Sequence, residues 1–205
     1  KLIGISGSLA VENAGFNDDI DLFTVTRKNS LWITRFFSII LISFFGKIRF
    51  AKTKNKRNKI CLNMFVSENS LAFSKDIYTA HEIAQLKVVI NKNNMYEKLL
   101  YKNRWIHSYL PNACLFGKQN DSDKQSGWID KILSFPEAVF YVFQYLYMKK
   151  KRTNETVSFY KAMFHPRDCK ENVLSFYHKK LEEVGYKNNS VLGKIEQKQA
   201  QFWVN

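Results

Sequence analysis

Two aspartates separated by one residue are the clearest candidates for chemistry in this chain. Asp19 and Asp21 open residues 19–25, which alternate polar and apolar side chains as a half-buried strand does. Side chains at i and i+2 of a strand point to the same side, about 7 Å apart at the backbone. Two such carboxylates repel each other unless a cation lies between them. Mg²⁺ is the natural candidate, because hard cations take oxygen ligands and readily add substrate phosphates.

A Gly-Ser pair upstream offers these acids a phosphate partner. Gly7 and Ser8 follow the apolar run 2–6, so we expect them at the turn where a strand leads into a short helix. Free backbone N–H groups and a hydroxyl at such a turn can bind an anion. A phosphate held there would lie close to a metal ion on Asp19 and Asp21, as phosphoryl or nucleotidyl transfer requires. The aspartate spacing alone also fits a solvated edge strand.

The combined motif resembles the nucleotidyltransferase superfamily typified by DNA polymerase beta, in particular stand-alone bacterial and archaeal nucleotidyltransferase-domain proteins. The residues that carry the resemblance are Gly7-Ser8 and Asp19-Ile20-Asp21-Leu22. The resemblance implies that Gly7 and Ser8 hold the phosphates of an NTP, and that Asp19 and Asp21 bind Mg²⁺ and are catalytic. It implies transfer of NMP with release of pyrophosphate. The acceptor stays open between a small molecule, a protein and an RNA.

A third acid, which completes the site in that family, is missing where we expect it. The strand expected to carry it covers residues 60–67, and its central inward position is Asn63. An amide can offer an oxygen to a metal ion but is no general base. Glu68 or Asp76 could supply the carboxylate, the site could work with two acids, or catalysis could be lost. The alternative function is therefore a catalytically impaired protein of the same fold that binds nucleotide or nucleic acid.

A helix expected over residues 76–90 adds three weaker candidates. His81 or Glu82 could line a substrate cleft, and Lys87 could contact a triphosphate. Residues of these types on a single helix more often have a structural role or are exposed to solvent. Both a role in a substrate site and such a structural role therefore stay open.

The distribution of elements predicts an α+β fold. Strands are expected in residues 1–70, and helices after them. The later helices are expected over residues 76–90, 94–110, 128–149, 155–164 and 168–184. This pattern predicts a small mixed-sheet nucleotidyltransferase-like domain over residues 1–75, followed by a helical domain over residues 76–205. The apolar run of the first expected strand starts at residue 2, so we expect residues before it to be missing.

Two apolar stretches bear on membranes and self-association. Residues 31–46 have an uninterrupted apolar core that is far shorter than the roughly 20 residues of a membrane span. They predict a buried helix with Ser30 as its N-cap, and no stable membrane insertion. A second helix, over residues 135–152, is rich in aromatic side chains and basic at its end. We expect it in the core or at a homodimer interface, with stacking on bases or contact with a membrane surface as alternatives.

The net charge limits which partners we expect, and the cysteine content limits which cell compartment we expect. The chain has 205 residues and a formal net charge of +14, which favours anionic partners such as NTP or RNA, although solubility also explains it. The cysteines are Cys61, Cys114 and Cys169, an odd number without a short metal-ligand spacing. They predict neither a disulfide framework nor a zinc site, and a cytoplasmic protein is the simplest interpretation.

Overall fold

A computed structural model describes residues 1–50, 53–113, 127–149, 156–164 and 167–183. The chain divides into two compact units, Lys1–Pro166 and Arg167–Asn205. The second unit contains the helix α6, Arg167–Glu183, which confirms the helix expected there. Residues 184–205 of the expected helical domain lie outside the described residues. The account below concerns the first unit.

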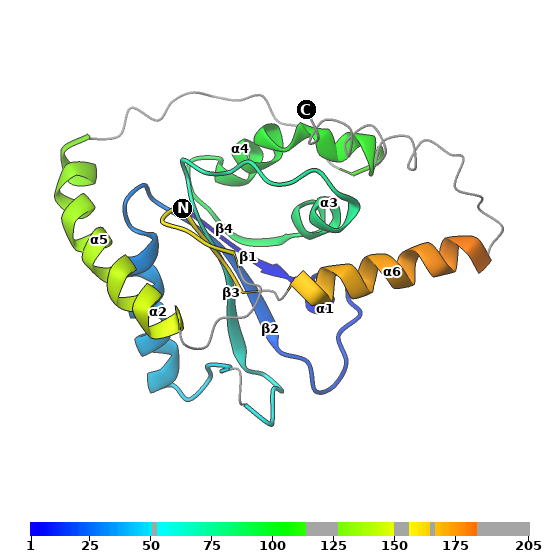
Figure 1. The fold of residues 1–205 in the computed structure, drawn as a ribbon, viewed down its shortest axis with the longest axis horizontal. Coiled ribbons are helices and arrows are strands. Elements are labelled where there is room, and N and C mark those ends of the chain that lie inside the picture. Colours follow the sequence, from blue (N-terminus) through cyan, green and yellow to red (C-terminus); the bar gives the residue numbers. More distant parts are fainter. Residues whose placement is uncertain (51–52, 114–126, 150–155, 165–166, 184–205) are drawn as a thin grey trace. The chain divides into compact units, whose positions relative to one another are not determined.

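The first unit is built on a six-stranded mixed sheet with the strand order β4-β1-β2-β3-β6-β5 (Figure 1). The strands are β1 Leu2–Ser6, β2 Ile20–Thr26, β3 Ile60–Ser67, β4 Lys87–Asn91, β5 Thr156–Val157 and β6 Lys161–Met163. β2 and β3 pair in parallel, and the other neighbours are antiparallel. A parallel pair needs a crossover, which the helix between β2 and β3 provides.

Helices cover both faces of the sheet (Figure 1). They are α1 Gly7–Ala10, α2 Leu31–Phe44, α3 Ile77–Ala84, α4 Met95–Lys102, the 3₁₀ helix η1 Arg104–Ser108 and α5 Gly127–Lys149. One core lies under α3 and α4, where Phe23 and Val25 of β2 contact Ile83 and Leu99. The other lies under α2 and α5 and is centred on the fully buried Trp32. β2, β3 and β6 contribute residues to both cores because successive side chains point to opposite faces of the sheet.

Two of the expected helices are partly or wholly wrong. Residues 87–90, the end of the helix expected over 76–90, belong to the edge strand β4, where Ile90 pairs with Ile3 of β1. Its consecutive β-branched residues, which lose side-chain freedom in a helix, favour a strand. The helix expected over 155–164 is also wrong, because β5 and β6 form a hairpin there that pairs with β3.

The sheet therefore uses strands from well beyond residue 75, and the first compact unit continues to Pro166. The strands expected over residues 2–6 and 60–67 are confirmed, as is the helix over 128–149. The helix expected over 94–110 is divided into α4 and η1. Within the described residues, none of the helices combines the length and the apolar character needed to cross a membrane.

Candidate metal and phosphate site

The carboxylates of Asp19 and Asp21 lie together at the start of β2, as their spacing predicts. An oxygen of each and the Cys61 sulfur all lie within 4.8 Å of one another, and the three residues are half-buried. Asp21 pairs with Cys61 in the parallel ladder of β2 and β3, so both side chains leave the sheet on one side. The backbone N–H of Ile20 donates to the carbonyl of Lys59 at 2.8 Å, which fixes this end of β2.

Cys61 is the β3 residue that pairs with Asp21, two residues before the predicted Asn63. Asp21 pairs with Cys61 but Phe23 pairs with Met64, so Leu22 faces two residues of β3 at a bulge. The bulge interrupts the strand alternation on which the prediction of Asn63 rested, and Asn63 is buried within it. Burial, and then the charge of Asp21, raise the pKa of the Cys61 thiol to about 12, so the sulfur stays protonated at neutral pH.

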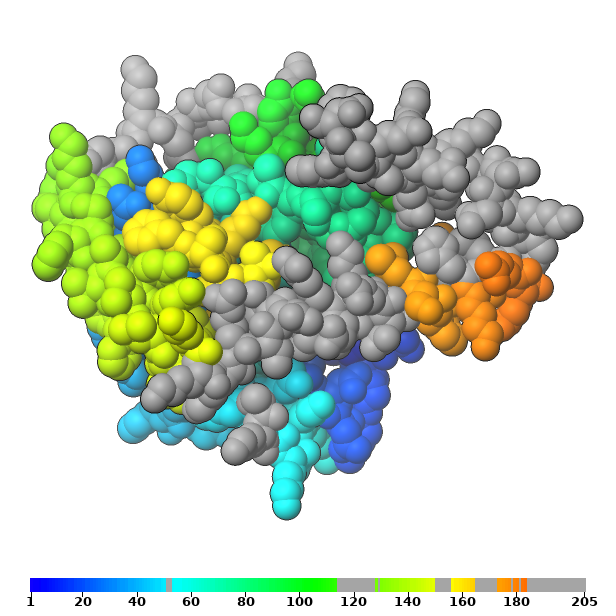
Figure 2. Space-filling model, viewed as in Figure 1, coloured from blue at the N-terminus to red at the C-terminus, as the bar shows by residue number. Residues whose placement is uncertain are grey.

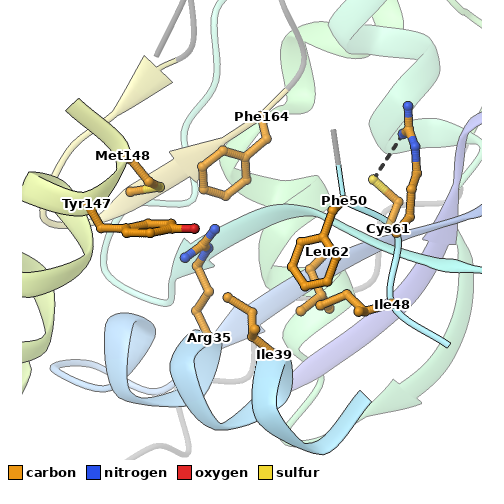
Figure 3. Close-up of a pocket in the computed structure, with 10 residues that line it drawn as sticks. Arg35, Ile39, Ile48, Phe50, Cys61, Leu62, Tyr147, Met148 and Phe164 are labelled. Atoms are coloured by element: carbon orange, nitrogen blue, oxygen red, sulfur yellow. Dashed lines mark hydrogen bonds between the residues drawn. The ribbon is translucent and has the colours of Figure 1, made fainter. Parts of the chain in front are cut away.

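An arginine that the motif does not include completes this cluster. The Arg49 guanidinium lies 2.8 Å from Asp19 Oδ2 and donates through the same nitrogen, Nη1, to Cys61 Sγ at 3.3 Å (Figure 3, dashed line). Its backbone N–H donates to the carbonyl of Ile60 at 2.9 Å, so the segment after α2 is tied to the start of β3. Arg49 thus supplies a positive charge beside the acids. Nothing in its local sequence distinguishes it from the neighbouring basic residues.

Gly7 stands at the predicted turn and approaches the acids closely. Its φ is +67°, a left-handed value that favours glycine. A Cβ at this position would lie 2.7 Å from Asp21 Oδ2, closer than real Cβ contacts come. Both observations favour glycine here, and the second places the turn between β1 and α1 directly against Asp21.

Ser8 is engaged by a different aspartate. Its hydroxyl donates to Asp18 Oδ2 at 2.9 Å, and the backbone N–H of Gly15 donates to the same oxygen at 2.9 Å. These two hydrogen bonds lower the pKa of the exposed Asp18 carboxyl. Asp18 therefore closes the loop before β2 and holds the Ser8 side chain, and Ser8 must rotate to bind a phosphate.

The carboxyl of Glu82 on α3 is close enough to Asp21 for the negative charge of Asp21 to affect its pKa. Its Oε2 is shielded from solvent and has no hydrogen-bond partner among the described residues. Burial, and secondarily the negative charge of Asp21, raise the pKa of Glu82 to about 7. This carboxyl can therefore exchange a proton near neutral pH, which suits a general base. On the same helix His81 is half-buried, and its burial lowers its pKa.

The other predicted residues lie in different settings. Glu68 accepts from the backbone N–H of Lys28 at 2.9 Å and pairs with Lys1 at 3.4 Å, just after the far end of β3. Glu68 is seven residues from Cys61, which at roughly 3.3 Å per residue is about 23 Å along the strand. Asp76 is the N-cap of α3, where it accepts from the Thr79 N–H at 2.8 Å. Lys87 is exposed and pairs with Glu12 at 2.7 Å.

A cavity of about 270 Å³ lies next to the acidic cluster (Figure 3). Arg49 and Cys61 line this cavity and also lie beside the acids. Among the described residues that line it, the charged ones are two arginines, and most of the others are apolar. Arg35 points into the cavity from α2, donates to Gln144 at 2.6 Å and lies 4.4 Å from the ring centre of Phe164. Such a lining suits an apolar group with an anionic substituent better than a cation.

The donor set fits a hard divalent cation on the two carboxylates. Mg²⁺ and Mn²⁺ take oxygen ligands, whereas a protonated thiol is a poor ligand for Mg²⁺. The metal would therefore be held by Asp19 and Asp21, and Cys61 would border it. Comparisons of the chain with protein-family models, with curated proteins and with solved structures give no match.

Proposed function

We propose that this protein is a metal-dependent nucleotidyltransferase, which transfers NMP from an NTP to an acceptor and releases pyrophosphate. The observation that carries the proposal is the convergence of Asp19 and Asp21 beside the Gly7 turn. Mg²⁺ on these carboxylates would neutralise charge on the reacting phosphate. The turn at Gly7 and the Ser8 hydroxyl would hold the remaining phosphates by hydrogen bonds.

Two residues outside the motif have roles in this proposal. Arg49 would leave Asp19 when the metal ion binds, and its guanidinium would then be available to a phosphate. Glu82 would accept the proton of the acceptor hydroxyl, because its pKa of about 7 leaves a useful fraction ionised at neutral pH. The cavity lined by Arg35 and Arg49 would receive part of the nucleotide or the acceptor.

The experiment supplies labelled NTPs, Mg²⁺ and pools of small-molecule, protein and RNA acceptors, and measures pyrophosphate release and label transfer. The test variants are Asp19→Asn and Asp21→Asn, and the control is Glu97→Gln, an acid on α4 that accepts from Asn91. We expect both test variants to lose about a hundredfold in rate, as removal of electrostatic stabilisation does, while the control keeps the wild-type rate. Absence of both pyrophosphate release and metal-dependent NTP binding in the wild type would contradict the proposal.

A second function is favoured by one specific observation. The β3 residue opposite Asp21 is Cys61, a neutral thiol, so this strand brings no third carboxylate to the pair. A catalytically impaired protein of this kind would bind NTP or RNA without releasing pyrophosphate. Its affinity should fall steeply with salt, because the chain carries a net charge of +14. Equilibrium binding at low and at physiological salt tests this, and salt-insensitive binding would count against it.

A further inference from the structure

The outer side of α2 and α5 is a continuous apolar face. Exposed apolar residues recur at helical spacing on α2 (Phe37, Leu41, Phe44) and on α5 (Phe135, Val142, Leu146). The two helices adjoin, because the rings of Phe36 and Phe37 lie 4.9 and 6.1 Å from the ring of Phe140. Side chains of α5 form one flank of the molecule in the space-filling view (Figure 2). We call this surface the α2–α5 face.

The extent of the α2–α5 face sets it apart from ordinary exposed apolar residues. Phe44 is 84% exposed and Phe135 is 78% exposed, and Phe37, Phe45, Phe143 and Tyr147 are each more than half exposed. At about 150–250 Å² for each aromatic side chain, these six expose on the order of 800 Å². The largest apolar patch of a typical monomer covers about 300–600 Å², and a larger one marks an interaction site.

The charges around this face select the kind of partner. α2 contains no acidic residue, and both acids of α5 are engaged: Asp130 pairs with Arg27 at 2.9 Å, and Glu137 is buried. The exposed charged side chains at the described ends of α2 and α5 include Lys47, Lys131 and Lys149. Two copies of this face would therefore bring like charges together at the rim. An apolar surface with a cationic rim is instead complementary to anionic lipid.

We propose that the α2–α5 face docks on the surface of an anionic lipid bilayer, with both helices lying in the plane of the headgroups. The exposed phenylalanines enter the boundary between headgroups and acyl chains, and the rim lysines contact the anionic headgroups. Trp128, near the start of α5, is exposed and is a residue type that favours this boundary.

The experiment measures co-sedimentation of the full chain with vesicles of phosphatidylcholine alone and of phosphatidylcholine mixed with phosphatidylserine. One test variant is Leu41→Gln with Phe44→Gln, and its control is Phe16→Gln, a phenylalanine that is 72% exposed in the loop before β2. The other is Lys47→Gln with Lys149→Gln, and its control is Lys92→Gln with Lys102→Gln, which removes two lysines near β4 and α4. Circular dichroism and thermal unfolding confirm that each variant is folded.

We expect the wild type to bind the phosphatidylserine vesicles and not the others. The apolar double variant should lower the partition coefficient at least about tenfold. The lysine double variant should lower it about thirtyfold, and both controls should stay near the wild type. The proposal is overturned if the wild type stays in the supernatant, or if the controls lose as much binding as the test variants. It is also overturned if sedimentation without vesicles shows a dimer that the apolar variant dissociates, because the face is then a self-interface.

Discussion

Arg49 binds Asp19 at the position where a metal ion would also bind. Its guanidinium is 2.8 Å from Asp19 Oδ2 and bonds to the neighbouring thiol. A divalent ion that bound through Asp19 Oδ2 would have to displace this cation. In this structure the negative charge of Asp19 is balanced by Arg49.

Removing that cation should strengthen metal binding. We expect Arg49→Gln to bind Mn²⁺ about tenfold more tightly than the wild type, because the competing positive charge is gone. Mn²⁺ titration followed by electron paramagnetic resonance measures the affinity directly. The control is Arg57→Gln, which removes a cation that lies over the ring of Phe16. Unchanged affinity in Arg49→Gln would show that Arg49 does not compete for Asp19.

Glu82 should make stability depend on pH in the direction opposite to that of most carboxylates. Its pKa is about 7 in the folded protein, against an ordinary 4.5, so the folded state binds more protons between these values. The free energy of unfolding should therefore fall as pH rises through this window, by up to about 3 kcal/mol from this group.

Urea unfolding at pH 5 and at pH 8 tests this prediction. Glu82→Gln should remove most of the decrease, while Glu97→Gln should keep it. A wild type and a Glu82→Gln variant with equal pH dependence would mean that Glu82 is ionised in the folded protein without cost.

At the scale of elements, the N-terminus of α2 depends on α5. Ser30 stands at the predicted N-cap position, but its hydroxyl donates to the Arg27 carbonyl rather than capping the helix. The Glu137 carboxylate instead accepts from the N–H groups of Trp32 and Ile33, at 2.8 and 3.1 Å. A carboxylate at a helix N-terminus satisfies free donors and interacts favourably with the helix dipole.

This capping should be measurable as stability. We expect Glu137→Ala to lower the free energy of unfolding by about 2–4 kcal/mol, because buried N–H groups lose charged acceptors. Glu137→Gln keeps one acceptor and should cost about half as much. Guanidinium unfolding measures both, with Lys131→Ala on the exposed side of α5 as control. Equal stability of Glu137→Ala and the control would contradict the capping role.

Elements whose hydrophobic pattern fits only one kind of secondary structure could be predicted from the sequence. Elements whose pattern fits both a helix and a strand could not. The apolar runs at residues 2–6 and 60–67 and the long helix at 128–149 need no distant partner to be recognised. The run Leu86–Ile90 fits a buried helix face and a strand equally well, and its pairing with β1 decides between them. Asp19, Asp21 and Gly7 could be placed because their neighbourhood is local. Cys61 and Arg49 could not, because a bulge and a crossover bring them to the acids.

At the scale of the molecule, the core of the first unit crosses the boundary expected near residue 75. Ile83, Leu99 and Ile106 pack against Leu2 and Phe23, and Ala162 of β6 is fully buried. The β3–β6 pairing joins segments about a hundred residues apart in the chain, a distance over which sequence patterns give no pairing information. The expected division into two domains rested on the apparent lack of strands after residue 70.

Truncation should locate the cooperative unit. A chain ending at Pro166 should keep the thermal transition of the first unit, because its sheet and both cores are complete. Chains ending at residue 75 or 155 should not fold, since they lack β6 and, for the shorter one, α3 and α4 as well. Circular dichroism melting of the three chains tests this. A cooperative transition in residues 1–75 would instead support the smaller domain.

Because Gly7 lies close to Asp21, the residue at one of these positions limits which residues fit at the other. A Cβ at position 7 would lie 2.7 Å from the Asp21 carboxylate oxygen, so a larger residue there requires the Asp21 side chain to move. Replacing Asp21 with a smaller residue removes that contact and leaves the positive φ of position 7 as the remaining constraint. The effects of substitutions at these two positions should therefore be interdependent.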